Sequence, residues 1–345
     1  MFCVVRRVVT GSLAERLLAG DPRAIARAIS LIEDEDPAAA DLVRAIFPST
    51  GRAYLIGVTG PPGAGKSTLV DRLVATIRGT QSSQRAPRNV AQTQDGVAGF
   101  AFPVSVGVIA VDPTSPFTGG AVLGDRLRMQ THSSDEGVFI RSMATRGHLG
   151  GLARATGDAA LVLDAAGKEI VIIETVGVGQ DEVDIIRTAD VSIVTLVPGT
   201  GDEVQALKAG IMEIADIFVV NKADREGAER LVSAVESNLA LHNYADGEWR
   251  PPIVKTVATT GQGLSELLEA IGRFRAHSLG TQAARRRTRS EYRLRELVSQ
   301  RFMDHLERQV LTTGELGTIV DRIAAREVDP YSAANDLLKR AIGSR

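Results

Sequence analysis

Short runs of consecutive apolar residues recur along the middle of the chain, and segments with a single apolar face separate most of them. The runs have the length of buried β-strands, and they cover residues 54–59, 104–111, 138–141, 169–174, 191–197, 217–220 and 253–257. Between them, helical spacing of apolar residues is found in 149–166, 202–214 and 226–241. Because the runs are continuous rather than alternating, both faces of each strand should be buried. The pattern therefore predicts an α/β fold with a mostly parallel sheet flanked by helices.

The first fifty residues have a helical pattern instead, with three start signals for short helices. Ser12 and Glu15 have the spacing of a capping box. Asp21-Pro22 and Asp36-Pro37 each place an N-cap carboxylate before a proline at the first helical position. Apolar side chains then share one face of the second and of the third helix: Ile25, Ile29 and Ile32, followed by Leu42, Val43, Ile46 and Phe47. Residues 1–50 are therefore predicted to form a helical segment, either a cap on the next domain or an arm that binds a partner.

Beyond residue 275 the pattern is purely helical and basic at its start. One apolar stripe follows the predicted helix through Leu294, Leu297, Val298, Phe302, Leu306 and Val310. A protruding helix with such a stripe needs a second surface to cover it. The arginines from Arg285 to Arg289 are interpreted as a solvated helix start rather than a nucleic-acid site. The predicted organisation is a helical segment at 1–50, a central domain at 51–275 and a helical extension at 276–345.

Composition narrows the classes of partner and compartment. The 345 residues carry a formal net charge of −2, which gives no reason to expect binding to nucleic acid or to an anionic membrane. No apolar run is long enough for a transmembrane helix, and the first residues do not have the pattern of a signal peptide. The single cysteine, Cys3, excludes an intramolecular disulfide and a cysteine-based zinc site. We therefore expect a cytoplasmic protein.

The strand predicted at 54–59 leads into Gly60-Pro-Pro-Gly-Ala-Gly-Lys66-Ser67, and a helix then extends to about Arg78. A G-x-x-x-x-G-K-[ST] loop between a strand and a helix indicates a phosphate-binding P-loop. Its glycines let backbone N–H groups approach a pyrophosphate, and the helix adds the positive end of its dipole. Lys66 can reach the β- and γ-phosphates, and the Ser67 hydroxyl can bind Mg²⁺. The predicted nucleotide contacts are Gly60, Pro61, Pro62, Gly63, Ala64, Gly65, Lys66, Ser67 and Thr68.

Acidic residues follow two other predicted strands, at the carboxyl ends where parallel sheets bind ligands. Asp112 ends the second strand and Asp125 lies in the loop after it. Carboxylates there can hold Mg²⁺ through its waters or orient an attacking water, while an aspartate before proline can also simply start a turn. Glu174 has the place of a Walker B acid, and Gly177 that of a γ-phosphate sensor. Metal contacts are predicted for Ser67, Asp112, Asp125 and Glu174.

A third motif selects the base. Asn221-Lys222-Ala-Asp224 has the N-K-x-D pattern at the end of the strand predicted at 217–220. An ionised Asp224 can accept hydrogen bonds from N1–H and the 2-amino group of guanine, whereas adenine would leave this carboxylate unpaired. Such a mismatch can discriminate by roughly 10⁴-fold. Lys222 can pack along the base and the Ala258 N–H can bind the guanine oxygen, so the predicted ligands are GTP or GDP with Mg²⁺.

Together these motifs resemble those of the ArgK/MeaB family of P-loop GTPases, over about residues 12–310. The resemblance rests on residues 57–68, 111–116, 118–125, 143–152, 174–180, 198–208 and 221–224. The family implies a dimeric, metal-dependent GTPase that serves adenosylcobalamin-dependent methylmalonyl-CoA mutase and related mutases, gating cofactor loading and protecting the mutase from inactivation.

The resemblance also implies roles for individual segments. The metal and water shell comprises Asp112, Asp125 and Glu174, and the catalytic residues are Lys66, Asp125 and Glu174. Residues 202–208 transmit nucleotide state to the mutase, and the C-terminal extension builds the homodimer. Neither nucleic acid nor membrane is an expected partner.

One segment departs from the family pattern. Residues 79–103 form a long connection rich in Gln, Ser, Asn and Gly, a composition that favours a disordered insertion. Two alternative functions stay open: a metal-delivery accessory GTPase and a kinase linked to amino-acid transport. The first predicts a segment rich in His or Cys, which this chain lacks, and the second needs an acceptor-hydroxyl pocket and a general base, neither of which can be assigned.

Overall fold

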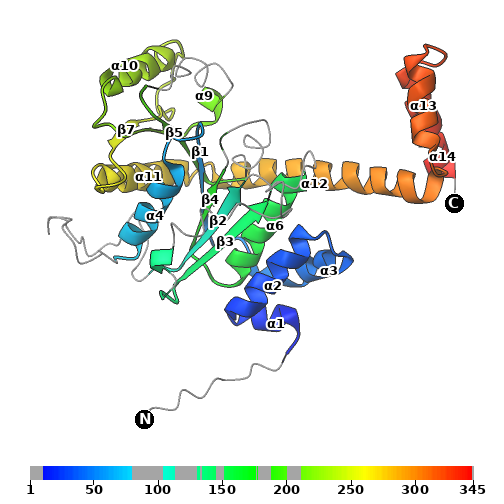
Figure 1. The fold of residues 1–345 in the computed structure, drawn as a ribbon, viewed down its shortest axis with the longest axis horizontal. Coiled ribbons are helices and arrows are strands. Elements are labelled where there is room, and N and C mark those ends of the chain that lie inside the picture. Colours follow the sequence, from blue (N-terminus) through cyan, green and yellow to red (C-terminus); the bar gives the residue numbers. More distant parts are fainter. Residues whose placement is uncertain are drawn as a thin grey trace. The chain divides into compact units, whose positions relative to one another are not determined.

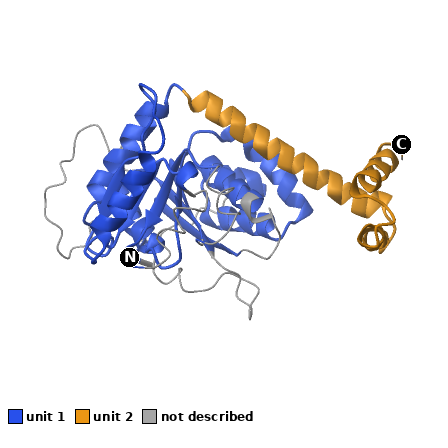
Figure 2. Cartoon of the chain, turned by 90° about the horizontal axis from the view of Figure 1, so that it is seen from above, with its two compact units in different colours: residues 1–280 blue, residues 281–345 orange. Residues whose placement is uncertain are grey.

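The structure is a computed structural model of the whole chain. The residues that it describes are 11–79, 104–112, 130–132, 134–144, 151–175, 177, 188–199 and 211–343. These residues divide into two units, Met1–Gly280 and Thr281–Arg345 (Figure 2). The predicted division into 1–50, 51–275 and 276–345 stays a prediction. Of the insertion predicted at 79–103, residues 80–103 lie outside the described residues.

Among the described residues of the first unit, seven parallel strands form one sheet (Figure 1). They are Tyr54–Thr59 (β1), Val106–Asp112 (β2), Val138–Ala144 (β3), Ile170–Glu174 (β4), Val191–Leu196 (β5), Ile217–Asn221 (β6) and Ile253–Thr256 (β7). Their spatial order is β3-β2-β4-β1-β5-β6-β7, so β1 lies between β4 and β5. The predicted α/β fold and parallel sheet are confirmed. Only β3 differs appreciably from its predicted span, because it continues three residues beyond residue 141.

Helices flank this sheet. Those described in the first unit are Leu13–Leu18 (α1), Pro22–Glu33 (α2), Pro37–Ile46 (α3), Lys66–Ile77 (α4), Gly151–Ala165 (α6), Ile211–Ile214 (α9), Ala228–Leu239 (α10) and Leu264–Ser278 (α11), with 3₁₀ turns at Phe47–Ser49 (η1) and Gln130–His132 (η2). Of the helix predicted at 202–214, α9 lies within the described residues and 202–210 lie outside them.

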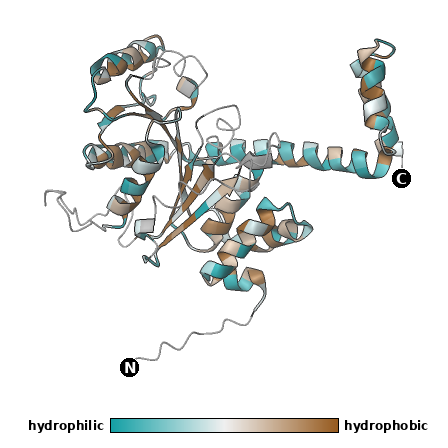
Figure 3. Cartoon of the chain, in the orientation of Figure 1, coloured by the Kyte–Doolittle hydropathy of each residue, from teal (hydrophilic) through white to brown (hydrophobic). Residues whose placement is uncertain are grey.

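The core has a layer on each face of the sheet, because alternate strand residues point to opposite faces. On one face Ile56 and Val58 of β1 pack with apolar residues of α4 and α11. On the other face Val171 and Ile173 of β4 pack with α6 and with the N-terminal helices. A third cluster joins α10 to β5 and β6. The strands are accordingly among the most hydrophobic segments of the chain (Figure 3).

The N-terminal helices begin at the predicted caps. Ser12 and Glu15 form the capping box, and Asp21 and Asp36 each accept a backbone N–H of the helix that they precede. Because α1, α2 and α3 bury their apolar faces in the same core as α6, the structure favours a cap on the sheet over a free arm. The prediction for Phe47 was wrong: its side chain is 59% exposed, because α3 ends at Ile46 and the chain turns into η1.

The second unit is helical. It contains Gln282–His305 (α12), a π-helical turn at Leu306–Val310 (η3), Glu315–Ala324 (α13) and Pro330–Gly343 (α14). Within the described part of the chain, no residue of α12 is buried, and Leu294 and Val298 of the predicted stripe are 61% and 58% exposed. None of the helices described here is both long and apolar enough to cross a membrane.

Candidate nucleotide-binding site

The loop from Gly60 to Gly65 joins the carboxyl end of β1 to the start of α4, as predicted. Gly60, Gly63 and Gly65 all have positive φ angles, of 141°, 77° and 86°, a region that glycine enters without strain. At two of these positions there is also no room for a side chain. A Cβ on Gly60 would overlap the Thr195 carbonyl, and one on Gly65 would lie 2.6 Å from Asn221 Nδ2. The close approach of backbone to neighbouring strands therefore explains these two glycines.

The remaining residues of the loop complete a cradle at the N-terminus of a helix. Pro61 accepts a turn hydrogen bond from the Ala64 N–H, and Pro62 and Gly63 are exposed at the tip of the loop. No side chain caps α4, which begins at Lys66 and carries Ser67 and Thr68 in its first turn. A helix N-terminus of this kind is suited to bind an anion through its amide groups.

Lys66 lies inside this cradle with only 6% of its surface exposed. Its ammonium donates to the carbonyl oxygens of Gly60 at 2.7 Å and Pro61 at 3.2 Å. These two bonds hold the positive charge within the curve of the loop. The lysine is thus placed beside the position where the first-turn amides would hold phosphate oxygens.

Ser67 and Glu174 meet near the carboxyl ends of the adjacent strands β1 and β4. The Ser67 hydroxyl donates to Glu174 Oε1 at 2.6 Å, and Glu174 lies opposite Val58 in the β1–β4 register. Both side chains offer the hard oxygen ligands that Mg²⁺ prefers. Mg²⁺ commonly takes one or two carboxylates and fills its other positions with waters and phosphate oxygens. The two residues therefore fit a magnesium ion.

The other predicted metal contacts are not tested by the structure. Asp112 ends β2, which pairs with β4, but its side chain lies outside the described residues, as do Asp125 and the segment 202–208. Among the described residues, no group of three or more His, Cys, Asp or Glu side chains could hold a metal ion. The metal assignments of Asp112 and Asp125 stay predictions.

Gly177 lies against the cradle, three residues beyond Glu174. Its φ angle is 103°. A Cβ there would overlap the Gly60 carbonyl and lie 2.6 Å from Lys66 Nζ. The backbone of this glycine therefore lies beside Lys66 and Gly60, and its role as a γ-phosphate sensor stays a prediction.

Asn221 connects three parts of the site at the end of β6. Its Nδ2 donates to the Ala64 carbonyl at 2.8 Å. Its Oδ1 accepts from the Thr256 hydroxyl at 3.0 Å and from the Ala258 N–H at 3.1 Å. The amide is buried and uses both ends, so it fixes the P-loop to the loop after β7.

The other predicted base contacts are Lys222, Asp224 and Ala258, and Lys222 and Asp224 follow Asn221 in the chain. Lys222 has a φ angle of 56° and donates from Nζ to the Gly63 carbonyl at 2.7 Å, which spans the space beside the P-loop tip. Asp224 is exposed and its carboxylate is accessible to a ligand. The Ala258 N–H, expected to bind guanine, is donated to Asn221 in this structure.

Sequence reasoning missed several residues that organise the site. Thr256 and Thr195 are fully buried beside it, and the Thr175 hydroxyl donates to Thr59 at 2.9 Å. Arg72 of α4 donates to the carbonyl of Thr259, in the loop after β7, at 3.1 Å. For the threonines the sequence signal was a polar residue at or near the end of a buried strand, and that position alone does not identify its partner; Arg72, on a helix, had no such signal.

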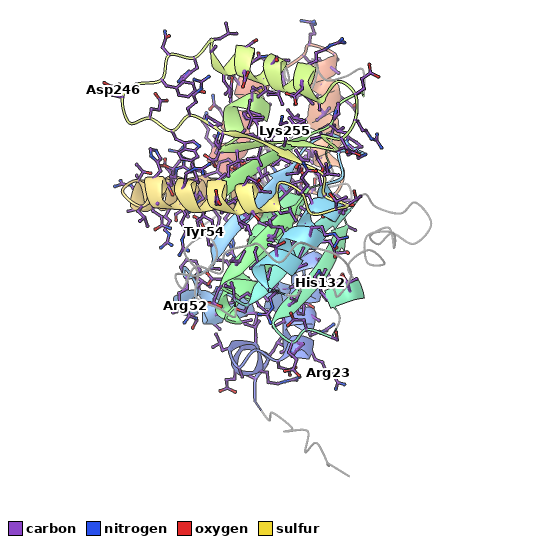
Figure 4. The ribbon with its side chains drawn as sticks, turned by 90° about the vertical axis from the view of Figure 1, so that its left-hand side faces the viewer. Arg23, Arg52, Tyr54, His132, Asp246 and Lys255 are labelled. Atoms are coloured by element: carbon purple, nitrogen blue, oxygen red, sulfur yellow. The ribbon has the colours of Figure 1, made fainter. Side chains whose placement is uncertain are left out.

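A second polar cluster flanks α4 away from the cradle. His132, labelled in Figure 4, is buried, and its Nε2 lies 3.1 Å from Asp71 Oδ1 and 3.2 Å from the Asp71 carbonyl. Both partners are acceptors, so Nε2 carries the proton. Hydrogen bonding to Asp71 raises the pKa of His132 against the opposing effect of burial. Close by, hydrogen bonds from Arg78 lower the pKa of Asp135.

Comparison with known proteins gives one consistent result. A family model described as "Methylmalonyl Co-A mutase-associated GTPase MeaB" matches residues 25–85 and 102–310, and so leaves out 86–101 within the long connection. A predicted GTPase of Pyrococcus abyssi is 50% identical over 337 residues, which are 96% of each chain.

Two further comparisons cover most of the chain. The mitochondrial methylmalonic aciduria type A homolog of Mus musculus is 30% identical over 360 residues, covering 99% of this chain and 80% of that protein. The crystal structure of a LAO/AO transport system kinase is similar with a TM-score of 0.65 and 26% identity, covering 95% of both chains.

Proposed function

The chain belongs to the MeaB family of methylmalonyl-CoA mutase-associated GTPases, and on that premise we propose that it binds GTP with Mg²⁺ at the β1–α4 site and hydrolyses it. One observation supports this proposal above the others. A phosphate cradle, a Ser67–Glu174 oxygen pair and an N-K-x-D motif all lie at the carboxyl ends of β1, β4 and β6. This is the edge at which parallel sheets bind their ligands.

Each group has a distinct task in hydrolysis. On binding of the triphosphate, Lys66 exchanges its bonds with the Gly60 and Pro61 carbonyls for phosphate oxygens and offsets charge that develops in the transition state. Ser67 and Glu174 would hold Mg²⁺, which would supply further charge neutralisation. Gly177 approaches the same terminal phosphate from the β4 side. The first-turn amides of α4 complete the set of donors.

Guanine selection is assigned to Asp224. An exposed carboxylate can accept from the N1–H and the 2-amino group of guanine at once, and adenine offers neither donor. Asn221 supports this recognition indirectly, because its bonds to the Ala64 carbonyl and the Thr256 hydroxyl join the P-loop to the end of β7. Ala258 serves the guanine oxygen only after its N–H leaves Asn221.

The partner is an adenosylcobalamin-dependent acyl-CoA mutase of the methylmalonyl-CoA type, for which the chain gates cofactor loading and protects the enzyme. The name of the family supports this assignment. The chain acts as a homodimer through its C-terminal helices, and the exposed apolar residues Leu294 and Val298 of α12 support that arrangement.

The decisive experiment compares nucleotides in a calorimeter. The wild-type chain should bind GTP and GDP in the presence of Mg²⁺ and prefer them to ATP by at least about 100-fold, because an unpaired carboxylate penalises adenine. Asp224→Asn should lose affinity for GTP and gain affinity for xanthosine triphosphate, whose 2-oxo group accepts from an amide. A wild-type preference for ATP, or no binding of purine nucleotides, would overturn the proposal.

Hydrolysis measured with and without purified mutase tests the partner. A GTPase rate that changes on addition of the mutase supports the assignment, and an unchanged rate contradicts it. A phosphorylated protein formed from labelled GTP would instead point to a kinase, the activity for which the similar solved structure is named.

A further inference from the structure

Two buried threonines connect the ends of β1 and β4. Thr59 is the last residue of β1, and Thr175 follows the last residue of β4. The Thr175 hydroxyl donates to Thr59 Oγ1 at 2.9 Å, and the Thr175 N–H donates to the Val58 carbonyl at 3.0 Å. Each residue is only 1% exposed. The pairing of the two strands therefore continues one residue past β4, and a side-chain bond joins it there.

The residues next to this pair are those assigned above to the terminal phosphate or to Mg²⁺. Gly60 follows Thr59 and begins the cradle, and Glu174, the partner of Ser67, precedes Thr175. Two residues after Thr175, the backbone of Gly177 contacts the Gly60 carbonyl and Lys66 Nζ closely enough that no side chain fits. The threonine pair is thus the point at which the cradle and the chain beyond β4 are joined.

We propose that Thr175 is a positioning residue for GTP hydrolysis: through its hydroxyl bond to Thr59 it holds Glu174 and Gly177 in place against Ser67 and Lys66. This inference rests on the proposed GTPase function and adds a residue to it. Thr175 touches no phosphate itself. Its effect is specific to the triphosphate, because Gly177 lies on the Lys66 side of the cradle and contributes to binding of the terminal group.

A buried threonine pair could instead serve stability alone, and the two roles predict different measurements. Loss of a structural bond lowers affinity for GDP and for a GTP analogue by the same factor. Loss of a positioning bond lowers affinity for the analogue more than for GDP and lowers kcat. The ratio of the two affinities therefore separates the roles, whatever the variant does to the unfolding temperature.

The test uses Thr175→Val, which keeps the shape and removes the donor, and Thr175→Ser, which keeps the donor. Dissociation constants for GDP and for a non-hydrolysable GTP analogue, and kcat for GTP, are measured with Mg²⁺ on the full chain. Thr175→Val should reduce the preference for the analogue over GDP by about five- to tenfold, the effect of one lost hydrogen bond. Thr175→Ser should restore most of that preference.

Thr156→Val is the matched control. Thr156 is equally buried, on α6, and its hydroxyl has no hydrogen-bond partner among the described residues, so its removal should leave the preference unchanged. If Thr175→Val does not fold, Thr175→Ala takes its place with the same expected change. An unchanged preference with wild-type kcat, or a serine variant as impaired as the valine variant, overturns the inference.

The two proposals fail in distinguishable ways. If wild-type protein does not bind GTP, the GTPase function fails before any variant is compared. If wild-type protein binds and hydrolyses GTP but Thr175→Val keeps the same preference, only the role of Thr175 is refuted.

Discussion

Asn221→Ala should lower the free energy of unfolding by about 3 kcal/mol. Asn221 is 1% exposed, and its amide satisfies the Ala64 carbonyl, the Thr256 hydroxyl and the Ala258 N–H. Truncation leaves all three groups without this partner in a buried region. Each buried group left unsatisfied costs about 1–3 kcal/mol, and the lower end of this range is used for each of the three groups. The sum of three such costs gives the expected loss.

The chain has a suitable probe for this measurement. Trp249 is its single tryptophan, its Nε1 donates to the Asp216 carbonyl at 2.8 Å, and its ring forms a T-shaped contact with the Phe274 ring. Unfolding of the first unit should therefore change its fluorescence. Urea titration without nucleotide gives the free energy by linear extrapolation, and an unchanged slope shows that the same surface is exposed in both proteins.

The matched control is Asn238→Ala on α10. Asn238 also donates its side-chain amide to a carbonyl, that of Ala234 at 2.9 Å, but in an exposed position. Its truncation should change stability by no more than about 0.5 kcal/mol. A loss at Asn221 below about 1 kcal/mol, or one no larger than at Asn238, would refute the view that this amide holds the loops of the site together.

Two further predictions concern the contacts around α4. Gly177→Ala should reduce kcat for GTP at least about tenfold, because the added Cβ meets Lys66 and Gly60. Gly167→Ala controls for backbone strain, because Gly167 has a positive φ angle but open space around it. Equal kcat values for the two variants would contradict the clash. Folding raises the pKa of His132, chiefly through Asp71, above its usual value of about 6.5. The resulting stabilisation is complete below about pH 6.5 and is lost as the pH rises through the raised folded pKa. Urea titrations from pH 5 to 9 should show this loss of stability in wild-type protein and not in His132→Asn. The same dependence of the unfolding free energy on pH in both proteins would contradict the prediction.

Apolar periodicity and turn residues were enough to predict most of the fold from the sequence. The strands were predictable because a parallel sheet covered on both faces requires continuous apolar runs, as Ile170–Glu174 shows. The helix starts at Asp21 and Asp36 were predictable because a cap is a local interaction. The exposure of Phe47 was not predictable, because it depends on the residue at which α3 ends and the 3₁₀ turn begins.

Local motifs likewise predicted the loop of the candidate site, but not the partners of its side chains. The spacing of Gly60 to Ser67 defines one loop, and a loop is a local structure. The bond between Asn221 and Thr256 depends on the register of β6 against β7, which no single stretch of sequence contains. For the same reason the meeting of Ser67 with Glu174 as direct hydrogen-bond partners required the structure.

Helix α4 shows how one element can bring distant loops under the influence of the same ligand. Lys66 and Ser67 lie in its first turn, and Asp71 and Arg72 follow in the second. Successive residues of a helix point about 100° apart, so Asp71 reaches His132 while Arg72 reaches the Thr259 carbonyl. Both contacts therefore depend on the position of the same helix. Since Thr259 adjoins Ala258, the loop after β7 is tied to α4 through Arg72 and to the end of β6 through Asn221.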